Sequence, residues 1–248
     1  MRTFRYDGSP DGFLTAVRLA LGQSDPVAFQ AAAGEGPVQG MLFDADTVAT
    51  DANSAAALLQ DLETAAGRGT VRDILHGFLG EHPRRDDLLF EGIRGGLHQR
   101  CPLHRMTCRP AQDLLKLVRQ VGHEIHLFHG LLRFSELADG TFYAPFEPDH
   151  NVLIPVARHF TVRLRDQQWV VHDCKRDLAV HWDRNQLRPI VAANSAGHTL
   201  EMAEDEAAYQ ACWRTYTQHI AIESRLNPRL QRQFMPRRFW RYLTEIGK

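Results

Sequence analysis

The spacing of apolar residues predicts helices in the first part of the chain, strands in the middle and helices again at the end. Residues 3–6 alternate and predict a short strand, after which Ser9 and Pro10 suit the cap and first position of a helix. Residues 24–37 are rich in Ala and Gly and carry only a weak pattern. Strands are expected at 38–43 and 47–50, and helices at 53–66, 70–81 and 86–99, with Asn53 as one cap and Thr70 with Asp73 as a capping box.

The strongest helical stripe follows Pro110, and Gly130 is expected to end that helix. Its apolar members are Leu114, Leu117, Val118, Val121, Ile125 and Phe128. Asp139-Gly140 then predicts the turn of a hairpin between residues 131–137 and 141–146. A helix capped by Asp149 is expected to reach Phe160, before a second hairpin (168–172 with 178–182) and a strand at 187–191.

A long helix is expected over residues 204–226, because Asn227-Pro228 breaks the helical pattern. Its inward positions are Ala208, Cys212, Tyr216, Ile220 and either Glu223 or Leu226. Two short helices separated by Pro236 follow. This order favours an α+β fold over a doubly wound one. We expect one compact unit over residues 1–248; the alternative is a helical part (1–100) and an α+β part (111–248) joined by the linker 101–110.

Composition narrows the class of protein. The chain has 248 residues, 44% of them hydrophobic, so it can order a sizeable core. It contains no run of 18 apolar residues and no secretory leader, and its four cysteines do not form a disulfide framework. We therefore expect a cytoplasmic protein without membrane contact.

Charge is distributed unevenly along the chain. The overall formal charge is −1, but residues 225–248 hold seven basic residues and one acidic residue. Arginines alternate here with aromatic residues. Guanidinium groups bind phosphates and aromatic rings stack on bases, so this segment predicts DNA contact. The expected DNA-binding residues are Arg225, Arg229, Arg232, Arg237, Arg238, Trp240 and Arg241. The alternative is a pair of amphipathic helices with Leu230, Phe234, Phe239 and Leu243 in the core.

Motifs for several common chemistries are missing from the sequence. There is no phosphate-binding loop, dinucleotide fingerprint, nucleophile elbow or cysteine triplet for an iron–sulfur cluster. His123-Glu124 fails the zinc-protease pattern because Leu127 occupies the position of the second histidine. A second set, His98, Cys101, His104 and Cys108, has residue types that suit zinc but no established spacing. We expect no metal or other cofactor, and leave this second set open.

Histidines and carboxylates near the predicted turns are the candidates for catalysis. His–carboxylate neighbours can transfer protons or position a ligand, and they can also simply close a turn. The candidate catalytic residues are His126, Arg133, Glu136, His150, His172 and Asp173.

Several stretches of the sequence together carry a resemblance to a known family. They are Tyr6–Ser9 with Gly12–Leu14, Leu131–Phe134 with Glu136, Tyr143–Pro145, Pro148–His150, His159–Phe160, Trp169, His172–Asp173, Asn227–Gln231 and Met235–Arg238. Over nearly its whole length the chain thereby resembles a bacterial family of unknown function whose members are labelled as DNA metabolism or DNA repair proteins. The resemblance implies a radical-SAM partner encoded nearby, and in some bacteria fusion to a uracil-DNA-glycosylase-like domain. Because this chain lacks cluster cysteines, radical chemistry would reside in the partner.

Three functions follow as hypotheses. The favoured one is a DNA repair or DNA modification accessory protein that binds DNA through its basic end and works with a radical-SAM or glycosylase-like partner. The second is an enzyme acting on DNA or nucleotides through the six candidate catalytic residues, which requires them to share one cleft. The third is a protein-interaction module without nucleic-acid contact.

Overall fold

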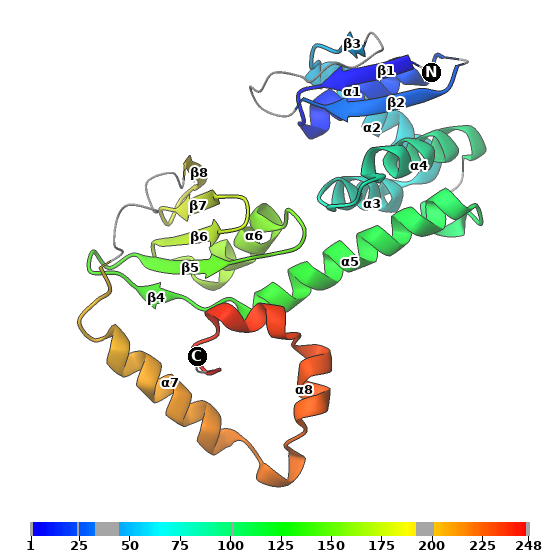
Figure 1. Ribbon diagram of the computed structural model, residues 1–248. Helices are drawn as coiled ribbons and strands as arrows, with labels where there is room; N and C mark the ends of the chain where they lie inside the picture. Colours follow the sequence, from blue (N-terminus) through cyan, green and yellow to red (C-terminus); the bar gives the residue numbers. More distant parts are fainter. Residues whose placement is uncertain (1, 24, 33–44, 101, 192–200, 247–248) are drawn as a thin grey trace. The chain divides into compact units, whose positions relative to one another are not determined.

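A computed structural model describes residues 2–23, 25–32, 45–100, 102–191 and 201–246 (Figure 1). The α+β class is confirmed: helices accompany a three-stranded sheet of order β2-β1-β3 and a five-stranded sheet of order β4-β5-β6-β7-β8. Where the sequence favours one unit, the chain forms two compact units, Met1–Gly122 and His123–Lys248. The boundary lies inside a helix, C-terminal to the linker expected at 101–110.

The described strands of the first unit pair in parallel, an arrangement that the sequence pattern does not predict. Its strands are β1 (Arg2–Tyr6), β2 (Val27–Ala31) and β3 (Ala45–Thr47). Helix α1 (Pro10–Ala20) connects β1 to β2, and the predicted cap is confirmed, since the Ser9 side chain accepts a hydrogen bond from the Gly12 amide. Strand β2 lies in the Ala-rich stretch that carries only a weak pattern, and the strand expected at 38–43 falls outside the described residues.

Three helices follow in the first unit: α2 (Ala52–Ala66), α3 (Arg68–Phe78) and α4 (Arg85–Gln99). Two predicted caps are wrong. Asp51, not Asn53, caps α2 by accepting from the Asn53 amide. Helix α3 begins after Gly67, and the Thr70 hydroxyl donates to the Ala66 carbonyl of the preceding helix instead of closing a capping box. A 3₁₀ turn (Leu103–Arg105) leads to the longest helix.

Helix α5 (Arg109–Leu131) confirms the strongest apolar stripe and continues one residue past Gly130. In its first half, Leu114 packs so closely on α4 that a Cβ at Gly92 would lie 2.6 Å from the leucine Cδ2. A methyl group there would displace Leu114, which is fully buried. The core of the first unit therefore depends on glycine at this helix contact.

The second unit is built on the five-stranded sheet. Its strands are β4 (Ser135–Glu136), β5 (Phe142–Phe146), β6 (Trp169–Asp173), β7 (Leu178–Trp182) and β8 (Leu187–Val191). Both predicted hairpins are confirmed as antiparallel pairs, and Gly140 has the positive φ, 80°, that its turn requires. Strands β5 and β6 run parallel, joined through α6 (Leu153–Arg163), and Trp169 is fully buried. Helix α6 starts after Val152 without a side-chain cap, so the Asp149 cap is wrong.

The end of the chain departs most from the predictions. It consists of α7 (Glu206–Ile220), a 3₁₀ turn (Glu223–Arg225), α8 (Pro228–Phe234) and a second 3₁₀ turn (Arg237–Tyr242). Figure 1 shows α7 and α8 as two sides of an open loop that leaves the sheet near β4 and returns beside α5. The helix expected to reach residue 226 ends at Ile220.

The residues of this helix that were predicted to face inward do not lie in a core. Ala208, Cys212, Tyr216, Ile220, Glu223 and Leu226 are all exposed, as are Leu230 and Phe234. Only Phe239 and Leu243 of the proposed core residues are buried. Helical spacing identifies an apolar face, but a face is buried only if another element packs on it. Among the described helices, none is long and apolar enough to cross a membrane.

Candidate nucleic-acid interface and adjoining pocket

The arginines of the basic end fall into two groups, and the first serves the fold. Arg238 forms an ion pair with Asp149, and Arg241 with Glu147. The Tyr242 hydroxyl also donates to Glu147 over 2.8 Å. Although burial raises the pKa of Glu147, the hydrogen bonds from Tyr242 and Arg241 leave it below its usual value. These contacts hold the last 3₁₀ turn against the end of β5.

The second group is available to a ligand. Arg225, Arg229, Arg232 and Arg237 are exposed, and no acidic side chain of the described residues forms an ion pair with them. The guanidinium of Arg237 lies over the ring of Trp240, 5.8 Å from its centroid. We call residues 222–237 the arginine segment. It displays cationic groups that are not neutralised by the protein.

Trp240, which the sequence places at the DNA contact, is held by the fold. Its indole nitrogen donates to the Met235 carbonyl over 2.8 Å, and the residue is half-buried. Exposed apolar side chains of the arginine segment are available instead: Leu226, Leu230 and Phe234 are 64%, 47% and 66% exposed. Phe234 is therefore the aromatic residue of the arginine segment best placed to stack on a base.

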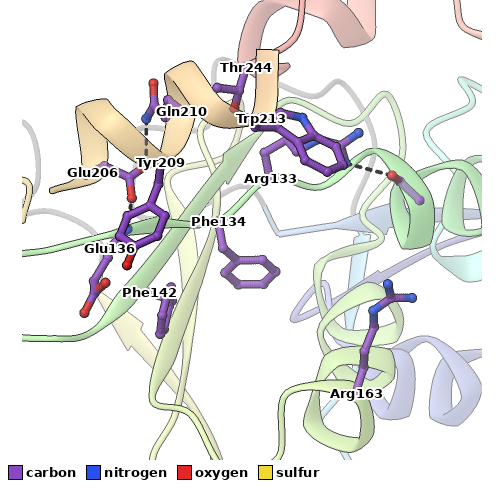
Figure 2. Close-up of a pocket in the computed structure, with 11 residues that line it drawn as sticks. Arg133, Phe134, Glu136, Phe142, Arg163, Glu206, Tyr209, Gln210, Trp213 and Thr244 are labelled. Atoms are coloured by element: carbon purple, nitrogen blue, oxygen red, sulfur yellow. Dashed lines mark hydrogen bonds between the residues drawn. The ribbon is translucent and has the colours of Figure 1, made fainter. Parts of the chain in front are cut away.

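A pocket of about 650 Å³ opens within the second unit (Figure 2). Four aromatic residues line it: Phe134, Phe142, Tyr209 and Trp213. Its polar lining residues are Arg133, Glu136, Arg163, Glu206, Gln210 and Thr244. In Figure 2, α7 supplies Tyr209, Gln210 and Trp213 from one side, Arg163 lies on α6 opposite them, and the rings of Phe134 and Phe142 lie between.

Two of the polar residues hold the walls together. Arg133 donates two hydrogen bonds to the Glu245 carboxylate, of 2.5 and 3.1 Å, and others to the Gly130 and Leu132 carbonyls. The Trp213 indole donates to the same carboxylate over 3.1 Å. Burial raises the pKa of Glu245, but hydrogen bonds from Arg133 and Trp213 keep it below its usual value. Arg133 is therefore a positioning residue whose donors are committed to the fold.

Glu206 has a similar role at the start of α7. It is buried, and its carboxylate accepts from the Glu136 amide (3.0 Å) and from the Gln210 side chain (2.7 Å). These bonds tie α7 to β4. By contrast, the side-chain carboxylate of Glu136 and the guanidinium of Arg163 make no hydrogen bond or ion pair within the described part of the chain. They are the charged groups of the lining that are free to meet a ligand.

The six candidate catalytic residues do not converge. Arg133 and Glu136 line the pocket, whereas His126 is exposed on α5. His172 contacts the Tyr143 hydroxyl (2.7 Å) and Asp177 (3.2 Å). Asp173 lies in a further group, paired with Arg176 over 2.8 Å, and the backbone amide of His150 donates to Glu124. The structure thus distributes these residues over separate groups.

One of those groups contains a cysteine, Cys174, that is not among the candidates predicted from the sequence. The Cys174 sulfur lies 3.7 Å from Nδ1 of His172, whose other ring nitrogen faces Asp177. This order resembles a nucleophile, base and orienting acid. However, burial raises the pKa of the Cys174 thiol, and burial raises that of neighbouring Tyr143 to about 12. Burial thus disfavours the thiolate, which is the nucleophilic form of a cysteine.

The near-miss zinc motif is structural. Glu124 is buried, and its carboxylate accepts the backbone amides of Asp149 and His150 over 2.9 and 2.8 Å. Of the second metal candidate set, Cys101 lies outside the described residues, and His98, His104 and Cys108 are exposed. In the described ranges, no group of three or more His, Cys, Asp or Glu side chains is placed to hold a metal ion.

A stacked histidine pair gives the second unit a testable pH dependence. The rings of His129 and His159 lie 4.1 Å apart, and burial together with the neighbouring His159 lowers the pKa of His129 below its ordinary value of 6.5. The unfolded chain then takes up a proton more readily than the folded chain. The free energy of unfolding should therefore have its full value above about pH 7.5 and decrease as the pH drops through 6.5.

Urea unfolding at pH 7.5 and pH 5.5 checks this expectation. His129→Gln, which removes the titrating ring, should lose less stability between the two pH values than the unchanged chain does. An equal loss in both proteins would show that other groups cause the pH dependence.

The aromatic pocket was not foreseeable as a site, because its lining residues come from β4, β5, α6, α7 and the chain end.

In comparisons with known proteins, the family model of a domain of unknown function, DUF4130, matches residues 83–245. No curated protein and no solved structure is significantly similar to the chain.

Proposed function

The chain belongs to the DUF4130 family of domains of unknown function, and we propose that it is a DNA-binding accessory protein of DNA repair or modification. The observation that carries the proposal is the arginine segment. Its four guanidinium groups, those of Arg225, Arg229, Arg232 and Arg237, are exposed and unneutralised by the described acidic side chains. Arginine donates two parallel hydrogen bonds to a phosphate, and DNA offers phosphates at regular spacing.

Exposed apolar groups support the same proposal. Phe234 and Leu230 lie on α8 beside Arg229 and Arg232, so phosphate and base can be contacted by one short helix. Combining a cationic surface with a stacking ring is the usual way to bind single-stranded nucleic acid without strong sequence preference.

A partner protein is the second part of the proposal. Tyr216, Ile220 and Ile222 are 56%, 56% and 54% exposed, and a run of exposed apolar residues of this kind is typical of an interaction surface. The partner that we propose, on the resemblance to a family labelled as DNA repair proteins, is a radical-SAM or uracil-DNA-glycosylase-like protein. In this arrangement the partner performs the chemistry, and the present chain contributes DNA contact.

Fluorescence anisotropy of labelled single-stranded and duplex DNA, at salt concentrations from 50 to 200 mM, tests the DNA contact. Four phosphate contacts should give a slope of log K against log salt of about −3 on a single strand. Absence of binding at the lowest salt would contradict the proposal and favour a protein-interaction module.

A further inference from the structure

We propose that the aromatic pocket of the second unit binds one unstacked nucleobase together with its phosphate. The inference rests on the proposed DNA contact and extends it to a second place on the same unit. The pocket is lined by four aromatic rings and has two charged side chains, Glu136 and Arg163, without partners among the described residues.

The aromatic rings suit a flat, rigid ligand. Tyr209 on α7 is 65% exposed, and Figure 2 shows Phe134 and Phe142 projecting into the space between α7 and α6. Phe134 is itself fixed by edge contacts with Phe160 and Trp169, at centroid separations of 5.0 and 6.1 Å. A ring held in this way loses little freedom when a base stacks on it.

The volume also fits. About 650 Å³ lies within the range of small-molecule sites and exceeds what a single base occupies. A neighbouring pocket of about 330 Å³ shares Gly130, Arg133, Phe134, Phe142 and Arg163 with it, so the opening continues past Arg163. The sugar and phosphate attached to the base can therefore follow this continuation.

The polar groups determine which base is preferred. The Glu136 carboxylate only accepts hydrogen bonds, and it has no donor among the described residues. Guanine presents two adjacent N–H donors on one edge, and cytosine and adenine each present an amino group. Thymine and uracil flank their single N–H with carbonyl oxygens, which a carboxylate repels. Bases with an amino group, guanine above all, are expected to bind best.

Arg163 completes the site as the phosphate contact. It is exposed at the pocket, on the side opposite Tyr209, and makes no ion pair with any acidic side chain that the structure describes. Arg133 cannot take this role because Glu245 and two backbone carbonyls occupy its donors. A nucleotide therefore spans the pocket from Glu136 to Arg163.

Calorimetric titration of the full chain with the four deoxynucleoside 5′-monophosphates tests the site. The guanine nucleotide should bind most tightly and the thymine nucleotide most weakly. Tyr209→Ala and Arg163→Glu should each weaken binding at least about tenfold. Glu136→Gln should reduce the difference between guanine and thymine nucleotides, since the amide both donates and accepts.

Arg165→Glu is the matched control: Arg165 is exposed close to Arg163 but does not line the pocket. Binding of no nucleotide at millimolar concentration, or equal weakening by Arg163→Glu and Arg165→Glu, would overturn the inference. The pocket variants leave the arginine segment unchanged. Failure there while DNA binding persists would disprove the pocket alone, and nucleotide binding without DNA binding would disprove the interface alone.

Discussion

Reversal of Arg229 and Arg232 to glutamate should weaken DNA binding about a hundredfold at 50 mM salt and lower the salt slope by about 1.4 on a single strand. Both side chains are exposed on α8 and make no ion pair with a described acidic residue. Replacing them removes two phosphate contacts and adds two like charges. The loss should be similar for all DNA sequences, because phosphate contacts carry no base information.

Arg105→Glu/Lys116→Glu is the control for the change in net charge. Both residues are exposed in the first unit, so this variant makes the same charge change away from the arginine segment. It should bind DNA within about threefold of the unchanged chain. If the control weakens binding as much as the double reversal does, the effect comes from net charge and the assigned interface is wrong. Arg238 and Arg241 are unsuitable targets, because their reversal breaks ion pairs with Asp149 and Glu147.

Asp173→Ala should reduce the free energy of unfolding by about 3–5 kcal/mol, the cost of removing one partner of a buried ion pair. The Asp173 side chain is fully buried, and its carboxylate pairs with Arg176 and accepts the Lys175 and Arg176 amides. Without it, the guanidinium of Arg176, 14% exposed, loses its ion pair with Asp173, and the Lys175 and Arg176 amides lose their acceptor. Urea unfolding measures the change.

The control for Asp173 is Asp166→Ala, at an exposed aspartate before β6, which should change stability by less than about 0.5 kcal/mol. A stable Asp173→Ala protein that has lost a function in DNA processing would contradict the structural role. It would instead return Asp173 to the catalytic candidates.

The α+β class and most elements were predictable because they depend on local pattern. The stripe that forms α5 and the turn at Asp139-Gly140 each specify an element within a few residues of sequence. Strand β2 was missed because a parallel strand covered on both faces need not alternate, and all five of its residues are half-buried.

At the end of the chain, by contrast, the local pattern gave the wrong prediction of burial. Tyr216 and Ile220 follow helical spacing, so the sequence predicted that they lie in a core, yet they are more than half exposed. Periodicity reports that a face is apolar, and only the three-dimensional arrangement decides whether this chain covers it. The sequence pattern therefore predicted residues of the proposed partner surface to be core residues.

For the candidate site, residue type was informative but pairing was not. The sequence shows the arginines as one basic segment, but only the structure separates Arg238 and Arg241, which bind Asp149 and Glu147, from Arg229 and Arg232. The pocket could not be found at all, because Phe142, Arg163 and Tyr209 lie far apart in sequence.

Hydrogen–deuterium exchange of the full chain, with and without a short single-stranded DNA, tests the central claim most directly. Peptides covering residues 222–237 should exchange more slowly when DNA is bound, while peptides from residues 52–99 of the first unit should be unchanged. DNA binding that leaves residues 222–237 unprotected, or that protects only the first unit, would contradict the assignment of the arginine segment as the DNA contact.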